Sequence, residues 1–337
     1  MSAAGIAAWQ RAIDLSIELG KAAPWECVSA DAILGIRDPV SREADWCTVM
    51  GHAGEVFGVA IYPGDDGFAT LQRLLDDDVD EFDAAITQRA ITLTFESAST
   101  LAPATKKLMK VLGRAFRGGR AWPELLLHEP GLAPAPALGE VRLQRVANTL
   151  CGLNSLLGWA RNDPNGSASA DDEHAWVTSP PFGEGDRQQQ KLPILATKPS
   201  TPPPYDRLAV ERVRAGNAAR RGKWFLDWFP GHGVIDGPEA EGRPFFICHV
   251  VLLDLENGLM LATEIGRVAT IASDIQHLLL RSFIKSGLPE TLLVRRQEVA
   301  EMLGPLVQAL GIPMHRDARL CEVTREVHEG LTSFLAR

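Results

Sequence analysis

The sequence lacks the features typical of membrane, secreted and cysteine-bound metal proteins. No run reaches about 18 apolar residues, the length needed to cross a bilayer, so we expect no membrane association. The first residues, 1–8, are apolar but lack the basic group of a signal peptide. The 5 cysteines form no Cys-x-x-Cys pair, which is typical of reduced thiols in a cytoplasmic protein.

An excess of basic charge is also absent. The chain has 337 residues and a formal net charge of −9, and residues 206–337 contain 16 Lys and Arg against 17 Asp and Glu. Proteins that hold duplex DNA usually carry a marked basic excess, because phosphate neutralisation supplies much of their affinity. The charge therefore disfavours a nucleic-acid partner. The partner stays unknown at this stage, and a protein is one candidate.

Common catalytic and nucleotide-binding motifs are missing as well. The chain contains no Gly-x-Ser-x-Gly, no Gly-x-Gly-x-x-Gly and no phosphate loop with Lys-Ser/Thr. These absences disfavour serine hydrolysis, nicotinamide chemistry and ATP chemistry. We therefore predict no cofactor, with Mg²⁺ required only if the chain is a metal-dependent nuclease.

Apolar periodicity over residues 1–161 predicts an N-terminal α+β domain. Strand patterns at 46–50 and 56–62 flank a glycine-containing turn, which indicates an antiparallel meander. We expect a turn at 63–67 and a helix from Pro103 to about Phe116. The following segment, 162–205, is rich in Pro, Ser and Gln, and we expect a linker with short extended pieces at 175–178 and 192–196.

Residues 206–337 form the predicted C-terminal domain, with elements in the order βββαβαβ. The expected strands are 223–229, 245–253, 258–264, 291–294 and 312–314, with helices at 270–286, 297–310 and 322–335. This order, together with the Gly-Leu-Pro-Glu connection at 287–290, resembles the RNase H-like superfamily and its integrase cores. The resemblance implies a mixed sheet with flanking helices, so the predicted fold class is α+β / α/β.

The same resemblance implies two-metal catalysis by clustered carboxylates. Asp227, on the first strand, falls at the place of the family's first catalytic aspartate and is the candidate metal ligand. Arg295 stands where the second aspartate follows the fourth strand, and a guanidinium cannot ligate a cation. Glu298 and Asp254 are the remaining catalytic candidates. The alternative makes Asp227 a solvent-facing strand residue and Asp254 a turn residue.

Four basic residues recur at helical spacing in the N-terminal domain: Lys106, Lys110, Arg114 and Arg117. On one helical face they would contact nucleic-acid phosphates or an acidic partner. The alternative is a solvent-exposed face whose positive charge compensates the acidic run at 76–83.

The whole chain resembles an uncharacterised bacterial family with two adjacent domains of unknown function. The sequence segments that carry this resemblance are Val49-Met50-Gly51 with Gly54-Glu55, Trp122-Pro123 before Glu129-Pro130-Gly131, and Arg243-Pro244-Phe245-Phe246. The resemblance implies no activity. We predict a non-enzymatic interaction or regulatory protein on a degenerate RNase H-like scaffold, because the carboxylate set is incomplete. The alternatives are a divergent Mg²⁺-dependent nuclease that uses Asp227 with Glu298 or Asp254, and a nucleic-acid-binding module without cleavage.

Overall fold

The computed structural model describes residues 1–75, 83, 86–162, 174–182, 187–193, 202–216, 219–235 and 243–335. The chain divides into two compact units. The N-terminal unit comprises Met1–Asp80, Thr87–Glu129 and Pro134–Ala196, and the C-terminal unit comprises Glu81–Ile86, Pro130–Ala133 and Thr197–Arg337. Two short segments from the first half of the sequence therefore belong to the C-terminal unit.

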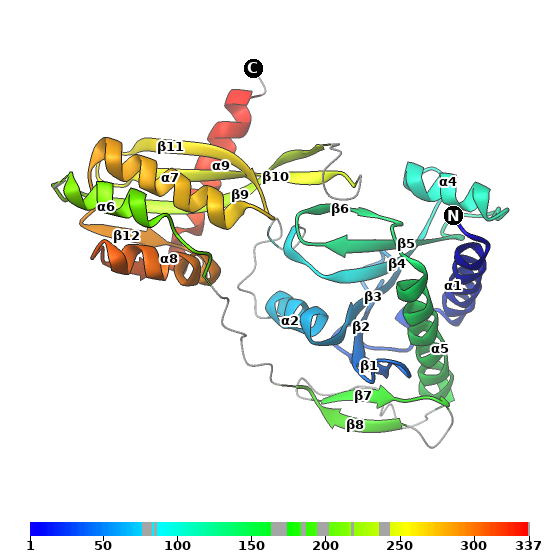
Figure 1. Cartoon of the computed structure of the whole chain (residues 1–337). Helices are drawn as coiled ribbons and strands as arrows, with labels where there is room; N and C mark the ends of the chain where they lie inside the picture. The colour runs from blue at the N-terminus through cyan, green and yellow to red at the C-terminus, as the bar shows by residue number, and fades with distance from the viewer. Residues whose placement is uncertain are drawn as a thin grey trace. The chain divides into compact units, whose positions relative to one another are not determined.

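Helices and strands are interspersed along the N-terminal unit (Figure 1). Its elements are α1 (Ala3–Ala22), η1 (Pro24–Glu26), β1 (Ile33–Arg37), β2 (Ala44–Met50), β3 (Gly58–Pro63), α2 (Gly64–Leu75), β4 (Ala90–Glu96), α4 (Pro103–Val111), β5 (Trp122–Glu129), α5 (Glu140–Asn162), β7 (His174–Thr178) and β8 (Arg187–Lys191). The strands run in the order β8-β7-β1-β2-β3-β4-β5, with β1 to β5 antiparallel and β7 parallel to β1. The predicted antiparallel meander is confirmed.

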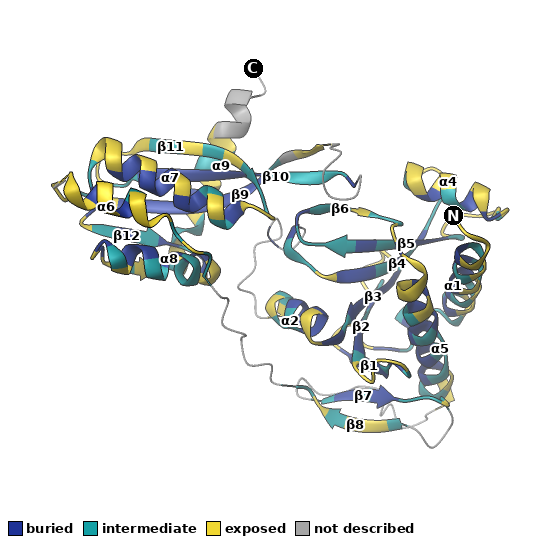
Figure 2. Ribbon diagram, viewed as in Figure 1, coloured by how far each residue is buried: buried dark blue, intermediate teal, exposed yellow. Residues whose placement is uncertain are grey.

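The sheet of this unit is covered on both faces, which accounts for the nearly continuous burial of β1 and β3. On one face α1 and α5 pack through Ile13 and Leu150 onto strand residues such as Leu93. On the other face α2 packs through Phe68 onto Trp46, with ring centroids 4.8 Å apart. Buried residues accordingly lie along the strands and the inward faces of the helices (Figure 2).

Several predicted boundaries in this unit are wrong. Of the turn expected at 63–67, Pro63 ends β3 and residues 64–67 form the first turn of α2. Gly64 permits the change of direction with a φ of 61°, and Asp65 and Asp66 favour a helix N-terminus. The helix expected to reach Phe116 ends at Val111, and Gly113 follows with a φ of 66°. Strand β5 was not expected at all.

The segment expected to be a linker contributes strands to the N-terminal unit. Strand β7 overlaps the extended piece expected at 175–178. Strand β8 precedes the second expected piece at 192–196, of which 194–196 lie outside the described residues.

The C-terminal unit contains a mixed sheet with the predicted βββαβαβ order. Its elements are β6 (Leu132–Ala135, shared with the N-terminal unit), α6 (Arg207–Ala215), β9 (Lys223–Ile235), β10 (Phe245–Asp254), β11 (Leu259–Arg267), α7 (Ile271–Ser286), β12 (Thr291–Val294), α8 (Gln297–Ala309), β13 (Met314–Arg316), η2 (Ala318–Leu320) and α9 (Cys321–Leu335). The strand order is β11-β10-β9-β12-β13, in which β9, β12 and β13 are parallel and β10 is antiparallel to both its neighbours. An α+β / α/β fold is confirmed, although β13 begins two residues later than expected.

Helices cover both faces of this sheet too. Trp224, Leu226 and Trp228 of β9 pack against α7 and α8 in one apolar core. The alternate residues Phe225, Asp227 and Phe229 point to the opposite face. Phe229 meets His328 of α9 there, with ring centroids 5.0 Å apart. No helix in the described parts of the chain is both long and apolar enough to cross a membrane.

Candidate functional site

Asp227, the main candidate from sequence, is completely buried at 0% exposure. The interpretation that it faces solvent is wrong, because α9 covers the face of β9 on which it lies. Thr324 of α9 donates its hydroxyl hydrogen to Asp227 Oδ2 at 2.7 Å. A buried carboxylate needs such partners, since burying an unpaired charge is very costly.

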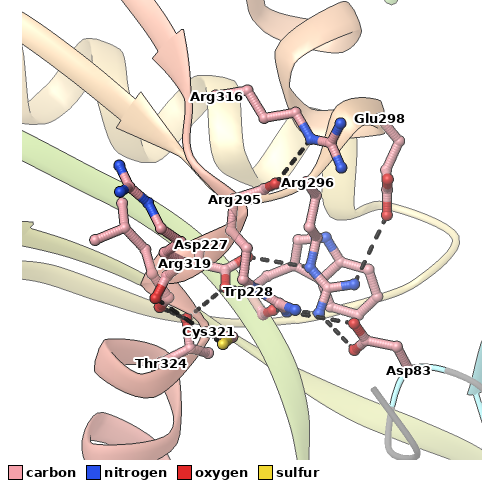
Figure 3. A network of polar contacts seen from close by, with 11 residues as sticks. Asp83, Asp227, Trp228, Arg295, Arg296, Glu298, Arg316, Arg319, Cys321 and Thr324 are labelled. Atoms are coloured by element: carbon pink, nitrogen blue, oxygen red, sulfur yellow. Dashed lines mark hydrogen bonds and ion pairs between the residues drawn. The ribbon is translucent and has the colours of Figure 1, made fainter. Parts of the chain in front are cut away.

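Two consecutive arginines after β12 hold the same carboxylate from the other side (Figure 3). Arg295 Nε donates to Asp227 Oδ2 at 2.8 Å, and Arg296 Nε donates to Asp227 Oδ1 at 3.0 Å. Both carboxylate oxygens are therefore occupied by charge-assisted hydrogen bonds. Arg295, which stands where a second catalytic aspartate was expected, therefore helps to neutralise Asp227.

Asp83 completes this buried centre. Arg296 Nη2 donates to Asp83 Oδ1, and Arg295 Nη2 lies 3.3 Å from Asp83 Oδ2. The side chains of Asp83, Arg295 and Arg296 are 8%, 11% and 5% exposed. Two acids and two bases thus form one electrically balanced cluster, which we call the Asp83–Asp227 centre.

Arg296 is the most enclosed cation of the centre. It also donates to the Trp228 carbonyl at 2.9 Å, and its guanidinium carbon lies 4.2 Å from the centroid of the Trp228 ring. Burial alone would lower the pKa of Arg296, but the nearby charges of Asp227 and Asp83 outweigh burial and raise it. Arg296 is therefore charged at neutral pH.

The other two catalytic candidates are not brought to Asp227. Asp227 pairs across the sheet with Val251, so Asp254 lies three residues farther along β10. Asp254 instead accepts hydrogen bonds from the Asn257 side chain and the backbone of the following turn, and these bonds lower its pKa. Glu298 is 51% exposed and lies 3.7 Å from Arg296 Nη1.

The centre does not fit a two-metal site. Both oxygens of Asp227 already accept from guanidinium or hydroxyl groups, and two positive charges stand beside it. Across the described ranges, no three His, Cys, Asp or Glu side chains are grouped as ligands for a metal ion. We therefore derive no metal-dependent step from these residues.

The basic residues of the N-terminal unit do not share one helical face. Lys106 and Lys110 lie on α4, but the helix ends before Arg114 and Arg117. Arg114 pairs with Asp14 of α1 at 2.7 Å. The described part of the acidic run does not pair with these basic residues. Asp83 binds Arg295 and Arg296, and residues 76–82 lie outside the described part.

Two residues of the centre were missed from sequence. Asp83 stands in an acidic run whose tertiary partner no periodicity reveals. Thr324 occupies an ordinary position of an amphipathic helix. The adjacent pair Arg295-Arg296 was the available signal, because arginines that are buried together with a strand need acidic partners.

Two family models match the chain. One, described as domain of unknown function DUF7309, matches residues 9–173, and the other, described as domain of unknown function DUF6930, matches residues 210–331. The chain carries one of each. The predicted resemblance to a family with two adjacent domains of unknown function is confirmed. No curated protein matches the chain.

Proposed function

We propose that the protein is a non-catalytic interaction or regulatory protein, and that its C-terminal unit is an RNase H-like scaffold without metal chemistry. The observation that carries this proposal is the capture of Asp227 by Arg295 and Arg296. The two guanidinium groups supply the positive charge that metal ions supply to clustered carboxylates in a nuclease. The strand order of the C-terminal unit supports the scaffold interpretation.

Energetics favours a permanent structural role for this centre. A metal ion could bind Asp227 only after the charge-assisted bonds to the arginines had broken. Breaking a buried ion pair by removing one partner costs about 3–5 kcal/mol, because the remaining charge is left uncompensated. The arginines are tethered to the fold and nearly buried, so no dissolved cation replaces them without that cost.

A protein is the partner that the surface of the C-terminal unit favours. Strand β11 pairs only with β10 among the described strands, and Leu259, Met260 and Ile265 are exposed on it. An apolar edge strand is a common site of protein–protein contact. The near-neutral charge of this half of the chain disfavours nucleic acid. The free cysteines suit a reducing compartment, and we place the protein in the cytoplasm.

The proposal is tested by asking whether the purified full-length protein cleaves labelled DNA or RNA when Mn²⁺ or Mg²⁺ is added. We expect no cation-dependent cleavage and no saturable Mn²⁺ binding by isothermal titration calorimetry. The nuclease alternative needs Asp227 with Glu298 or Asp254.

Two exposed positions provide variants that keep the fold. Glu298→Gln and Asp254→Asn leave the Asp83–Asp227 centre intact and should resemble the wild type in circular dichroism. Cation-dependent cleavage by the wild type that either variant abolishes would overturn the proposal. Cleavage that is unchanged in Glu298→Gln, in Asp254→Asn and in separately purified Asp227→Asn would identify a contaminating nuclease.

A further inference from the structure

A pocket of about 380 Å³ lies in the N-terminal unit, beside the end of α1 and the loop that joins α4 to β5. Its walls combine aromatic rings with basic side chains. The aromatic residues are Trp25, Phe57, Phe95 and Phe116, and the basic residues are Lys21, Arg117 and Arg120. We call this site the aromatic–cationic pocket. Its size is within the range of about 300–1,000 Å³ that small-molecule sites occupy.

The aromatic rings of the wall already pack against one another in the structure. The Trp25 ring meets Phe57 at 5.1 Å and Phe95 at 5.7 Å between centroids, both edge to face. Phe116 is held by Trp122 at 5.2 Å. Trp25, Phe57 and Phe116 remain partly exposed. Flat apolar surfaces of this kind bind planar rings by stacking or edge contacts.

No acidic residue in the described part of the chain forms an ion pair with the cations of the pocket. Lys21 and Arg117 are exposed and form no ion pair with any residue that the structure describes. The guanidinium carbon of Arg120 lies 3.9 Å from the centroid of the Phe57 ring. No Asp or Glu is among the described lining residues. Asp14 is paired with Arg114, which does not line the pocket. Glu18 and Glu26 are sequence neighbours of the lining residues Ile17 and Trp25 but do not line the pocket themselves.

The loop backbone contributes to the position of Arg120. Arg120 adopts a φ of 65°, and Gly118 just before it a φ of 116°. A positive φ is uncommon for a residue with a side chain and costs roughly 1–3 kcal/mol, so the contact with Phe57 must help to hold it. The loop thus presents a cation above an aromatic wall at a cost in backbone energy.

We propose that the aromatic–cationic pocket binds a small planar aromatic anion, in which a ring contacts Trp25 and Phe57 and a carboxylate or phosphate is held by Arg117, Arg120 and Lys21. Arginine suits both anions, because its planar guanidinium donates two parallel hydrogen bonds. This inference is independent of the proposed lack of catalysis in the C-terminal unit.

A second pocket in the same unit is a poorer anion site. It is lined by Arg89, Arg142 and Arg145 among others. Arg142 pairs with Glu129, and Arg145 pairs with Glu43 and Asp45. Only Arg89 of these three cations is left to attract an anion, so we assign no ligand there.

The test uses four probes and the full-length protein in isothermal titration calorimetry. Indole-3-carboxylate and adenosine 5′-monophosphate carry the two anionic groups, and indole-3-carboxamide and adenosine are their neutral counterparts. We expect at least one anionic probe to bind about tenfold more tightly than its counterpart, the factor that corresponds to about 1.4 kcal/mol. Because the two anionic probes also differ in their rings, each is compared with its own neutral counterpart, and the larger anionic preference indicates whether the pocket favours a carboxylate or a phosphate.

Matched variants locate the binding. The double variant Arg117→Gln/Arg120→Gln should weaken the anionic probe at least tenfold and leave the neutral probe within about twofold. Lys106→Gln/Lys107→Gln removes the same charge from exposed positions of α4 and should change neither. Phe57→Leu should weaken both probes.

Four results would overturn the inference. These are no binding of either anionic probe, equal binding of anionic and neutral probes, and an unchanged affinity in the Arg117→Gln/Arg120→Gln variant. The fourth is binding of a single-stranded oligonucleotide without binding of the mononucleotide, which would indicate an extended nucleic-acid surface in place of a small-molecule pocket.

Discussion

Each unit of the protein buries one strand aspartate against arginine and threonine, but the two centres differ in how completely charge is balanced. In the N-terminal unit, Asp45 of β2 accepts from Arg145 Nε at 2.8 Å and from Thr149 Oγ1 at 2.6 Å. In the C-terminal unit, Asp227 accepts from two arginines and from Thr324. Both aspartates are at most 1% exposed.

The difference lies in the cations. Arg145 is 24% exposed and is shared with the exposed Glu43. Burial raises the pKa of Asp45, and the bonds to Arg145 and Thr149 offset that rise only in part. Arg295 and Arg296 are nearly buried, and Asp83 balances their second charge. The comparison supports a structural role for both buried strand aspartates, including Asp227, which the sequence predicted as a candidate catalytic residue.

The largest effect is expected from Asp227→Asn. The substitution removes one charge from a balanced buried cluster and leaves an uncompensated guanidinium. We expect a loss of about 3–5 kcal/mol in the free energy of unfolding, measured by urea denaturation. Glu298→Gln at the half-exposed edge should cost less than about 0.5 kcal/mol. A loss below about 1 kcal/mol for Asp227→Asn would show that the centre contributes little to stability.

Asp45→Asn should cost less, about 2 kcal/mol at neutral pH, because Arg145 keeps Glu43 and contact with water. The pH dependence separates this centre from the other. Since the folded pKa of Asp45 is raised, the folded state takes up the proton first as pH falls. The wild type should therefore gain stability relative to Asp45→Asn below neutral pH, and the gain should be complete below the ordinary value of 3.8.

Denaturation of both proteins at several pH values measures this difference. Because other groups titrate in both proteins, their contributions cancel in the comparison. A wild type that loses stability relative to the variant as pH falls would show that the ion pair with Arg145 outweighs burial.

Periodicity and turn residues were sufficient to predict most of the C-terminal unit. Strand β12 was predicted with its observed bounds, and α8 within one residue, because their apolar spacing is clear, Gly287 and Pro289 precede β12, and Gly311 follows α8. The extent of α4 was not predictable in the same way. Basic residues continue at helical spacing beyond it, and the interruption at Gly113 is weak evidence against a helix.

The candidate site was predictable only in part. Asp227 and Arg295 were identified from their places on the strand order, and their opposite charges on neighbouring parallel strands make a contact reasonable. The burial of Asp227 was not predictable, because it depends on α9, whose Thr324 lies 97 residues later in the chain. Asp83 joins from a segment whose assignment to the C-terminal unit is a property of the folded chain alone.

The smallest effects are expected from the two threonines, and they test the comparison most finely. Thr149→Val and Thr324→Val each remove one hydroxyl donor while keeping the shape of the side chain. Asp227 Oδ2 keeps Arg295 Nε after the change, so Thr324→Val should cost about 0.5 kcal/mol. Asp45 Oδ2 has Thr149 as its hydrogen-bond donor, so Thr149→Val should leave that oxygen unsatisfied and cost about 1.5 kcal/mol.

Urea denaturation of the two threonine variants in one buffer measures this ranking. Both substitutions remove a buried hydroxyl donor to an aspartate, so the difference between their costs reports the second donor, Arg295 Nε, on Asp227 Oδ2. The reverse order, with Thr324→Val the more costly, would mean that the arginines do not satisfy Asp227 without the hydroxyl. The centre would then depend on α9 for a hydrogen bond that the Asp227 carboxylate requires.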